Sequence, residues 1–232
     1  MTPRRDPARV YAAVLAVASA AFVAIAAAVL FWASVDRLDV RAVHWVRRTA
    51  PDVLVDVMQV VTYAGSAVVL GPLVVLAALL CIRRGRTAAA IFVVAACAGS
   101  VLLSQALKAL FQRGRPELEE PFIQLTTYAF PSGHSFSATA TYGALALVLA
   151  SAAGERWQRV GLLMTAAALI IVIAGSRVVL GRHYTLDVLA GIAGGAALVS
   201  ALLLVLVRSR SARFHLEPFA RNEEPQRPGL DS

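Results

Sequence analysis

The stretch from Thr87 to Leu110, TAAAIFVVAACAGSVLLSQALKAL, is apolar almost throughout and carries the only lysine of the chain, Lys108, near its end. About 20 such residues are enough to cross a bilayer as a helix. Five further runs have the same character: Val10 to Ser34, Tyr63 to Ile82, Ser135 to Ala153, Val160 to Val179 and Asp187 to Val207. The sequence therefore predicts an all-α integral membrane bundle of six transmembrane helices.

The composition agrees with a membrane location. Hydrophobic residues make up 59% of the chain and charged residues 16%, whereas about half of an ordinary soluble domain is apolar. The formal net charge of +8 is interpreted as a topology signal and a contact for anionic lipids, not as a nucleic-acid interface. Of the 22 Lys and Arg residues, 13 fall on the side of the amino terminus, so the positive-inside rule predicts that both termini are cytoplasmic.

The segments outside the spans define the expected organisation. Residues 1–9 form a cytoplasmic amino terminus, residues 10–207 the six-span domain, and residues 208–232, with their prolines and alternating charges, a disordered cytoplasmic tail. The first apolar run exceeds the roughly 7–15 residues of a signal-peptide core, so it is taken as an uncleaved helix. Asp36 to Thr62 mixes charged and apolar residues and predicts an amphipathic segment at the outer interface.

Three short blocks carry ionisable residues at the ends of the predicted spans. They are Lys108 with Arg115-Pro116, then Pro131-Ser132-Gly133-His134, then Ser176-Arg177 followed by His183 and Asp187. The six-span topology places all three at outer helix ends, and ionisable residues at membrane depth are costly and usually functional. We therefore expect them to form one site, although Lys108, Arg115 and Arg177 taken singly could be snorkelling anchors and His134 a helix cap.

The residue types in these blocks suit a phosphate group. Arg115 and Arg177 can each grip two phosphate oxygens, whereas Lys108 supplies a point charge. Ser132 and the amide of Gly133 lie where the fourth span begins, and a helix amino terminus presents free N–H groups to an anion.

His183 and Asp187 are four residues apart, so on a helix they would share one face. The carboxylate could then hold Nδ1–H and leave Nε2 free to attack phosphorus.

The patterns K-x6-R-P, P-S-G-H and S-R-x5-H-x3-D resemble the three signatures of the type 2 phosphatidic acid phosphatase superfamily at every specified position. The resemblance implies that His183 is a nucleophile that becomes a phosphohistidine and that Asp187 orients it. It also implies that His134 protonates the leaving oxygen and then activates water. No metal and no other cofactor is implied.

The resemblance further implies a membrane lipid phosphatase, and the predicted topology puts its site at the extracytoplasmic face of a bacterial plasma membrane. By family analogy a polyprenyl diphosphate is the favoured substrate, with phosphatidate and phosphatidylglycerol phosphate as competitors. Two alternatives stay open: a vanadium haloperoxidase, which shares the motifs, and an inactive lipid-binding relative. The sequence leaves the oligomeric state open.

Other polar residues receive structural interpretations. Arg113 and Arg182 are taken as interfacial anchors that could still tune the local field, and the acidic run from Glu117 to Glu120 as a solvated loop instead of a metal site. The linker from Glu117 to Phe130 is expected to border the lipid entrance. Gly191 to Gly195 is expected to pack the sixth span against a neighbour.

Overall fold

The computed structural model describes residues 6–116 and 127–209, so the tail beyond residue 209 and the acidic run after Pro116 lie outside the described residues. Within these ranges the regular structure is helical throughout, which confirms the all-α prediction. The elements are α1 (Pro7–Phe31), α2 (Ala33–Thr49), α3 (Asp52–Thr62), the 3-10 turn η1 (Tyr63–Gly65), α4 (Ala67–Arg83), α5 (Thr87–Phe111), α6 (Gly133–Ala152), α7 (Arg156–Val179) and α8 (Thr185–Arg208).

Five of these helices, α1, α5, α6, α7 and α8, are long and apolar enough to cross a membrane. The expected count of six is reached if α3 with η1 and α4, which are bent by 42° and qualify only as a pair, are counted as one broken span. The second span was expected to start at Tyr63, but its straight part starts at Ala67. The break lies at Ser66, whose extended backbone is the N-cap of α4 and whose hydroxyl donates to the carbonyl of Tyr63 at 2.6 Å.

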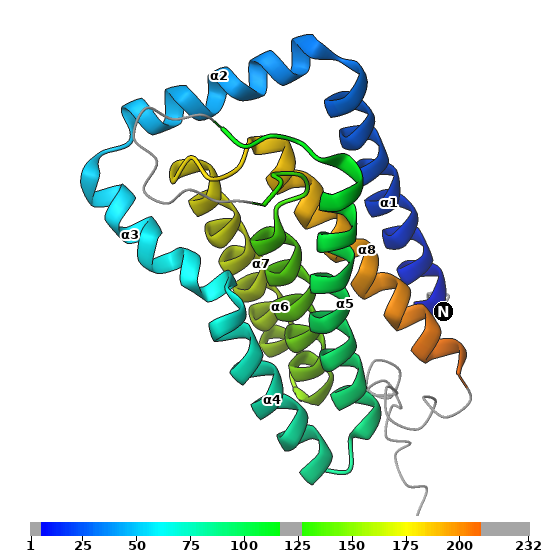
Figure 1. Ribbon diagram of the computed structural model, residues 1–232. Coiled ribbons are helices and arrows are strands. Elements are labelled where there is room, and N and C mark those ends of the chain that lie inside the picture. The colour runs from blue at the N-terminus through cyan, green and yellow to red at the C-terminus, as the bar shows by residue number, and fades with distance from the viewer. Residues whose placement is uncertain (1–5, 117–126, 210–232) are drawn as a thin grey trace, which may run out of the picture.

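The amphipathic segment expected over Asp36 to Thr62 is formed by two helices, α2 and α3. Figure 1 shows α2 lying across one end of the bundle, with α3 descending from it toward α4. At the same end lie the carboxyl ends of α5 and α7 and the amino ends of α6 and α8. The motif blocks therefore converge on the end that α2 covers, while the short turns at 84–86 and 153–155 lie at the other end.

Helix α6 is the centre of the bundle. It packs against α5, α7 and α8 and is mostly buried, whereas α1 lies along the outside of α8 and is mostly exposed. Its side chains are mostly Ala, Ser, Thr and Gly, and such small residues let membrane helices approach closely. The position of the motif residues at the ends of α5, α7 and α8 is thus set by their packing on one buried helix.

Three glycines of α8 make the contact with α6 possible. A Cβ added to Gly191 would lie 2.7 Å from the carbonyl oxygen of Ser132, and one added to Gly195 would lie 2.7 Å from the carbonyl oxygen of Phe136. At Gly194 the added atom would meet the Phe136 ring at 2.4 Å. The expected packing role of this segment is confirmed, and it sets the register between the starts of α6 and α8.

We expect Gly195→Ala to destabilise the protein by about 1–3 kcal/mol, a usual cost of overpacking. The added methyl group would face a backbone carbonyl of α6, which cannot rotate away as a side chain can. Thermal unfolding of the detergent-purified protein measures the effect.

Gly161→Ala is the matched control, because a Cβ there has no neighbour within 4 Å among the described residues. Its unfolding temperature should stay at or above that of the wild type. Equal unfolding temperatures for the two variants would contradict the close packing of α6 and α8.

Candidate active site

Lys108 lies in the last turn of α5 and its side chain is buried against the start of α6. A Cβ built on Gly133 would be 3.8 Å from its Nζ atom. Helix α5 ends four residues later, where Gln112 takes a left-handed conformation with φ of 48°. The chain of the first motif therefore turns at the amino end of α6, and the ammonium group of Lys108 lies beside that helix start.

The block Pro131 to His134 forms the amino terminus of α6, as the sequence predicted. Ser132 is the N-cap, and its hydroxyl accepts hydrogen bonds from the N–H and hydroxyl of Ser135. Its own N–H donates to the carbonyl of Asp187 at 2.9 Å. The second and third motif blocks are therefore joined directly through the backbone.

The third block is shaped by the end of α7. Gly181, with φ of 62°, reverses the chain so that the N–H groups of Arg182 and His183 both donate to the carbonyl of Arg177, at 3.0 and 3.2 Å. A left-handed residue after a helix is a common cap, and glycine adopts it without strain. This cap explains the spacing between Arg177 and His183.

The two arginines of the motifs are both fixed by neighbours. Arg177 is 2% exposed, and its Nη1 donates to the hydroxyl of Thr62 at 2.7 Å. Arg115 donates to the carbonyl of Arg182 at 2.7 Å and to the carbonyl of Thr127 at 2.6 Å. These contacts orient both guanidinium groups before any ligand is bound.

His183 and Asp187 meet, but not on one helix face as the sequence suggested. His183 lies in the turn before α8, whereas Asp187 is in the first turn of α8, where its Oδ2 accepts the N–H of Tyr184 at 3.0 Å. The His183 Nδ1 is 3.5 Å from Oδ2, longer than a formed hydrogen bond. On the other side of the ring, Nε2 is 3.3 Å from Nη1 of Arg115.

The environment of His183 favours the neutral imidazole. Burial, followed by the charges of Arg177, Arg115 and Lys108, lowers the pKa of His183 well below its usual 6.5. A neutral ring keeps a lone pair on one nitrogen, which a nucleophile requires. Cations of the first and third blocks, Lys108, Arg115 and Arg177, therefore act on this ring.

His134 lies in the first turn of α6 and is largely buried. The turn η1 packs against it, since a Cβ on Gly65 would be 3.3 Å from the His134 ring and 2.6 Å from Ile173. The positive charge of Arg177 acts on this ring as well. The structure thus brings together all eight residues that the sequence assigned to the site.

Arg113 was interpreted as an interfacial anchor, and this was wrong. Its side chain is 9% exposed, and its Nη1 lies 2.6 Å from Oδ1 of Asp187. Its Nη2 lies 2.5 Å from Asp36 and 3.2 Å from Asp39, and the guanidinium stacks 4.3 Å from the Tyr184 ring centre. Because Asp187 is fully buried, it needs such a partner, and an anchor facing solvent could not supply one.

Sequence reasoning also missed Asp36, Asp39 and Thr62. Asp36 and Asp39 are three residues apart on an amphipathic helix, so a shared polar face was a readable signal. No sequence pattern indicated a role for Thr62, because its contact with Arg177 depends on the bend between α3 and α4.

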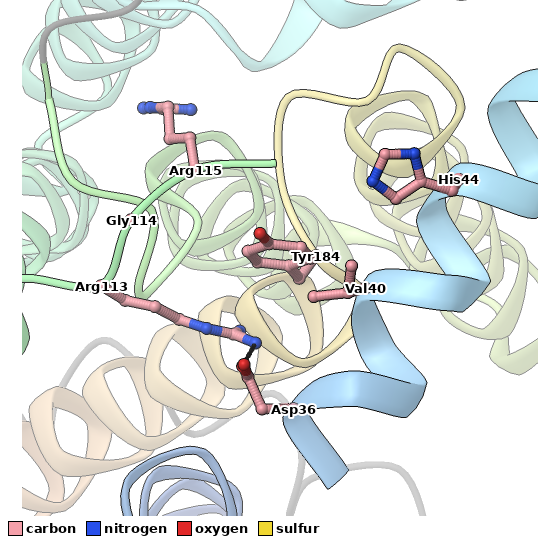
Figure 2. A pocket seen from close by; sticks show the side chains of 7 residues that line it. All are labelled: Asp36, Val40, His44, Arg113, Gly114, Arg115 and Tyr184. Atoms are coloured by element: carbon pink, nitrogen blue, oxygen red, sulfur yellow. Dashed lines mark hydrogen bonds and ion pairs between the residues drawn. The ribbon is translucent and has the colours of Figure 1, made fainter. Parts of the chain in front are cut away.

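A pocket of about 440 Å³ opens between α2 and the loop that carries Arg115. Figure 2 shows α2 on one side of it and the loop on the other, with Asp36 joined to Arg113. Its lining residues are Asp36, Val40, His44, Arg113, Gly114, Arg115 and Tyr184. Arg115 borders this pocket and contacts His183, so the pocket adjoins the motif residues.

The chain is similar in sequence and in fold to known proteins. The chain is 30% identical over 144 residues to phosphatidylglycerophosphatase B of Bacillus subtilis (strain 168), covering 62% of this chain and 70% of the relative. The crystal structure of a transmembrane PAP2-type phosphatidylglycerolphosphate phosphatase from Bacillus subtilis superposes with a TM-score of 0.74 at 24% identity, covering 84% of this chain and 98% of that one. A family model described as the PAP2 superfamily matches residues 88–211, which include every motif block. The chain therefore belongs to the PAP2 superfamily, a family of metal-independent membrane lipid phosphatases.

Proposed function

We propose that this protein hydrolyses a lipid phosphate through a phosphohistidine on His183. The observation that carries the proposal is the position of this imidazole, which has Asp187 beside Nδ1 and the Arg115 guanidinium beside Nε2. The carboxylate favours a proton on Nδ1, so the lone pair of Nε2 faces a cation that can hold a phosphate.

Lys108, Arg115, Arg177 and the start of α6 at Ser132 and Gly133 are the proposed phosphate-binding groups. Arg177 supports this assignment, because its buried Nε has no hydrogen-bond partner among the described residues. A phosphate oxygen would satisfy that donor, and guanidinium groups match phosphate geometry well. The cations would also stabilise charge on the equatorial oxygens during transfer.

In the proposed first step, Nε2 of His183 forms a bond to phosphorus while the bond to the leaving oxygen breaks. His134 donates a proton to that oxygen, which departs as an alcohol or a phosphate. In the second step His134 takes a proton from water, whose oxygen attacks phosphorus and breaks the N–P bond. Inorganic phosphate leaves, and both histidines return to their starting states.

For the substrate, the name of the Bacillus subtilis relative favours phosphatidylglycerol phosphate. The polyprenyl diphosphate favoured by the sequence remains the second candidate, and phosphatidate the third. We further propose that the end covered by α2 faces the outside of the cell, since the topology predicted from the sequence assigns 13 of the 22 Lys and Arg residues to the opposite side.

The substrate proposal predicts that the purified protein releases inorganic phosphate from phosphatidylglycerol phosphate faster than from a polyprenyl diphosphate or phosphatidate. The kcat/KM values in detergent micelles measure this order.

EDTA should leave the rate unchanged, because each proposed phosphate ligand is a protein cation, hydroxyl or amide. Halide oxidation by the vanadate-loaded protein at a rate near its phosphatase turnover would instead support the haloperoxidase alternative.

The proposed roles predict different losses at the two paired residues. His183→Ala should abolish turnover, because the atom that forms the covalent bond is gone, while Asp187→Asn should leave a small measurable rate. Phosphate release under saturating substrate compares them. A His183→Ala variant that keeps more than about a hundredth of the wild-type rate, a scale typical of acid–base groups alone, would rule out the phosphohistidine.

The orientation predicts opposite labelling of two exposed positions, Arg41 on α2 and Arg156 at the start of α7. Single cysteines replace each in a background without Cys81 and Cys97. An impermeant thiol reagent applied to intact cells should label position 41 and not position 156. The reverse pattern would place the site at the cytoplasmic leaflet.

A further inference from the structure

We propose that α2 positions the catalytic pair, with Asp39 acting through Arg113 on Asp187. Asp39 is thus a positioning residue, and the inference rests on the proposed phosphohistidine chemistry. It concerns a part of the chain outside the region that the family model matches, since α2 ends at Thr49 and the match begins at residue 88.

The first step of the argument is the geometry of Arg113. One end of its planar guanidinium contacts Oδ1 of Asp187 at 2.6 Å, and the other end contacts Asp39 at 3.2 Å and Asp36 at 2.5 Å. A guanidinium is rigid, so fixing one end of the fork fixes the direction of the other. The carboxylates of α2 therefore determine where Nη1 meets Asp187.

The second step is the effect of this contact on the carboxylate. With Oδ1 held by Arg113 and Oδ2 bound to the N–H of Tyr184, the Asp187 side chain cannot rotate freely. Its Oδ2 is then kept beside Nδ1 of His183. A carboxylate in this orientation selects the ring tautomer that leaves Nε2 unprotonated.

The third step is the second contact of Asp39. Its Oδ1 accepts the N–H of Thr185 at 2.8 Å and lies 3.3 Å from the N–H of Leu186. These are the first two residues of α8, so a side chain of α2 caps the helix that carries Asp187. The buried Asp39 therefore fixes both the start of α8 and the partner of its catalytic carboxylate.

Asp36 is less suited to this role. Its side chain is 44% exposed, whereas that of Asp39 is 3% exposed, and water can replace an exposed partner at small cost. Among the described residues, Asp36 also makes no hydrogen bond to the backbone of α8. The inference therefore assigns the main positioning effect to Asp39.

The test is the Asp39→Asn variant, assayed for kcat and KM with phosphatidylglycerol phosphate or whichever lipid phosphate the wild type cleaves best. We expect kcat to fall about 10- to 100-fold, because small misplacements of a catalytic group have effects of this size. KM should stay within about twofold of the wild-type value, because the loss is confined to the chemical step and therefore appears in kcat. Asp56→Asn, an exposed Asp of α3 with the same change in charge, should behave as the wild type.

A double-mutant cycle separates positioning from a general structural role. If Asp39 acts through Asp187, then Asp39→Asn should cause less than about a twofold further loss in an Asp187→Asn background. Independent, multiplicative losses would overturn the inference, as would an unchanged kcat in Asp39→Asn alone.

Arg113→Lys tests the fork without removing the positive charge. A single ammonium cannot bridge Asp187 and α2 as a planar guanidinium does. The kcat of Arg113→Lys should therefore fall about as far as the kcat of Asp39→Asn. Should Asp39→Asn fail to fold, Asp39→Glu and Arg113→Lys carry the same cycle. A fully active Arg113→Lys variant would refute the proposed link.

The failure of this inference is distinguishable from failure of the proposed function. If His183→Ala is inactive while Asp39→Asn and Arg113→Lys are fully active, only the positioning inference falls. If His183→Ala retains its rate, the phosphohistidine mechanism itself falls, whatever the result at Asp39.

Discussion

A carboxylate that is completely removed from water, that of Asp187, constrains the whole active-site end of the bundle. Removing the partner of a buried charge typically costs about 3–5 kcal/mol, so the fold must keep a cation at this position. Arg113 supplies it from the loop after α5, and α2 supplies the carboxylates that balance the remaining donors of Arg113. Helix α2 and the start of α8 are therefore linked through the same buried cation, Arg113.

The segment before the family region supports the second and third motif blocks. Asp39 reaches the start of α8, Thr62 holds the guanidinium of Arg177, and Gly65 lets the turn η1 approach His134. None of these three residues is among those proposed to touch phosphate. The residues proposed to react thus lie at the ends of the central helices, while α2, α3 and η1 contact the residues around them.

Close backbone packing provides the second constraint. The glycines of α8 place its first turns against α6, and the N–H of Ser132 bonds to the carbonyl of Asp187. The helix start proposed to bind phosphate is consequently packed directly against the start of α8, next to the proposed nucleophile. Sites built on packed helices hold their geometry better than sites on loops, and here Arg115 is the main contributor from a loop.

The sequence by itself determined the membrane bundle, the three motif blocks and the end at which they meet, because apolar run length and local spacing carry that information. It also indicated the helix start at Gly133 and the packing of Gly191 to Gly195. Only the tertiary structure decided that His183 lies before α8 instead of on its face, and that Arg113 is a buried counterion. The first outcome follows from the turn at Gly181 that ends α7. The second depends on contacts across more than 70 residues of sequence, between Arg113 and both Asp39 and Asp187. Local pattern cannot encode such contacts, since they arise only when α2 folds over the bundle.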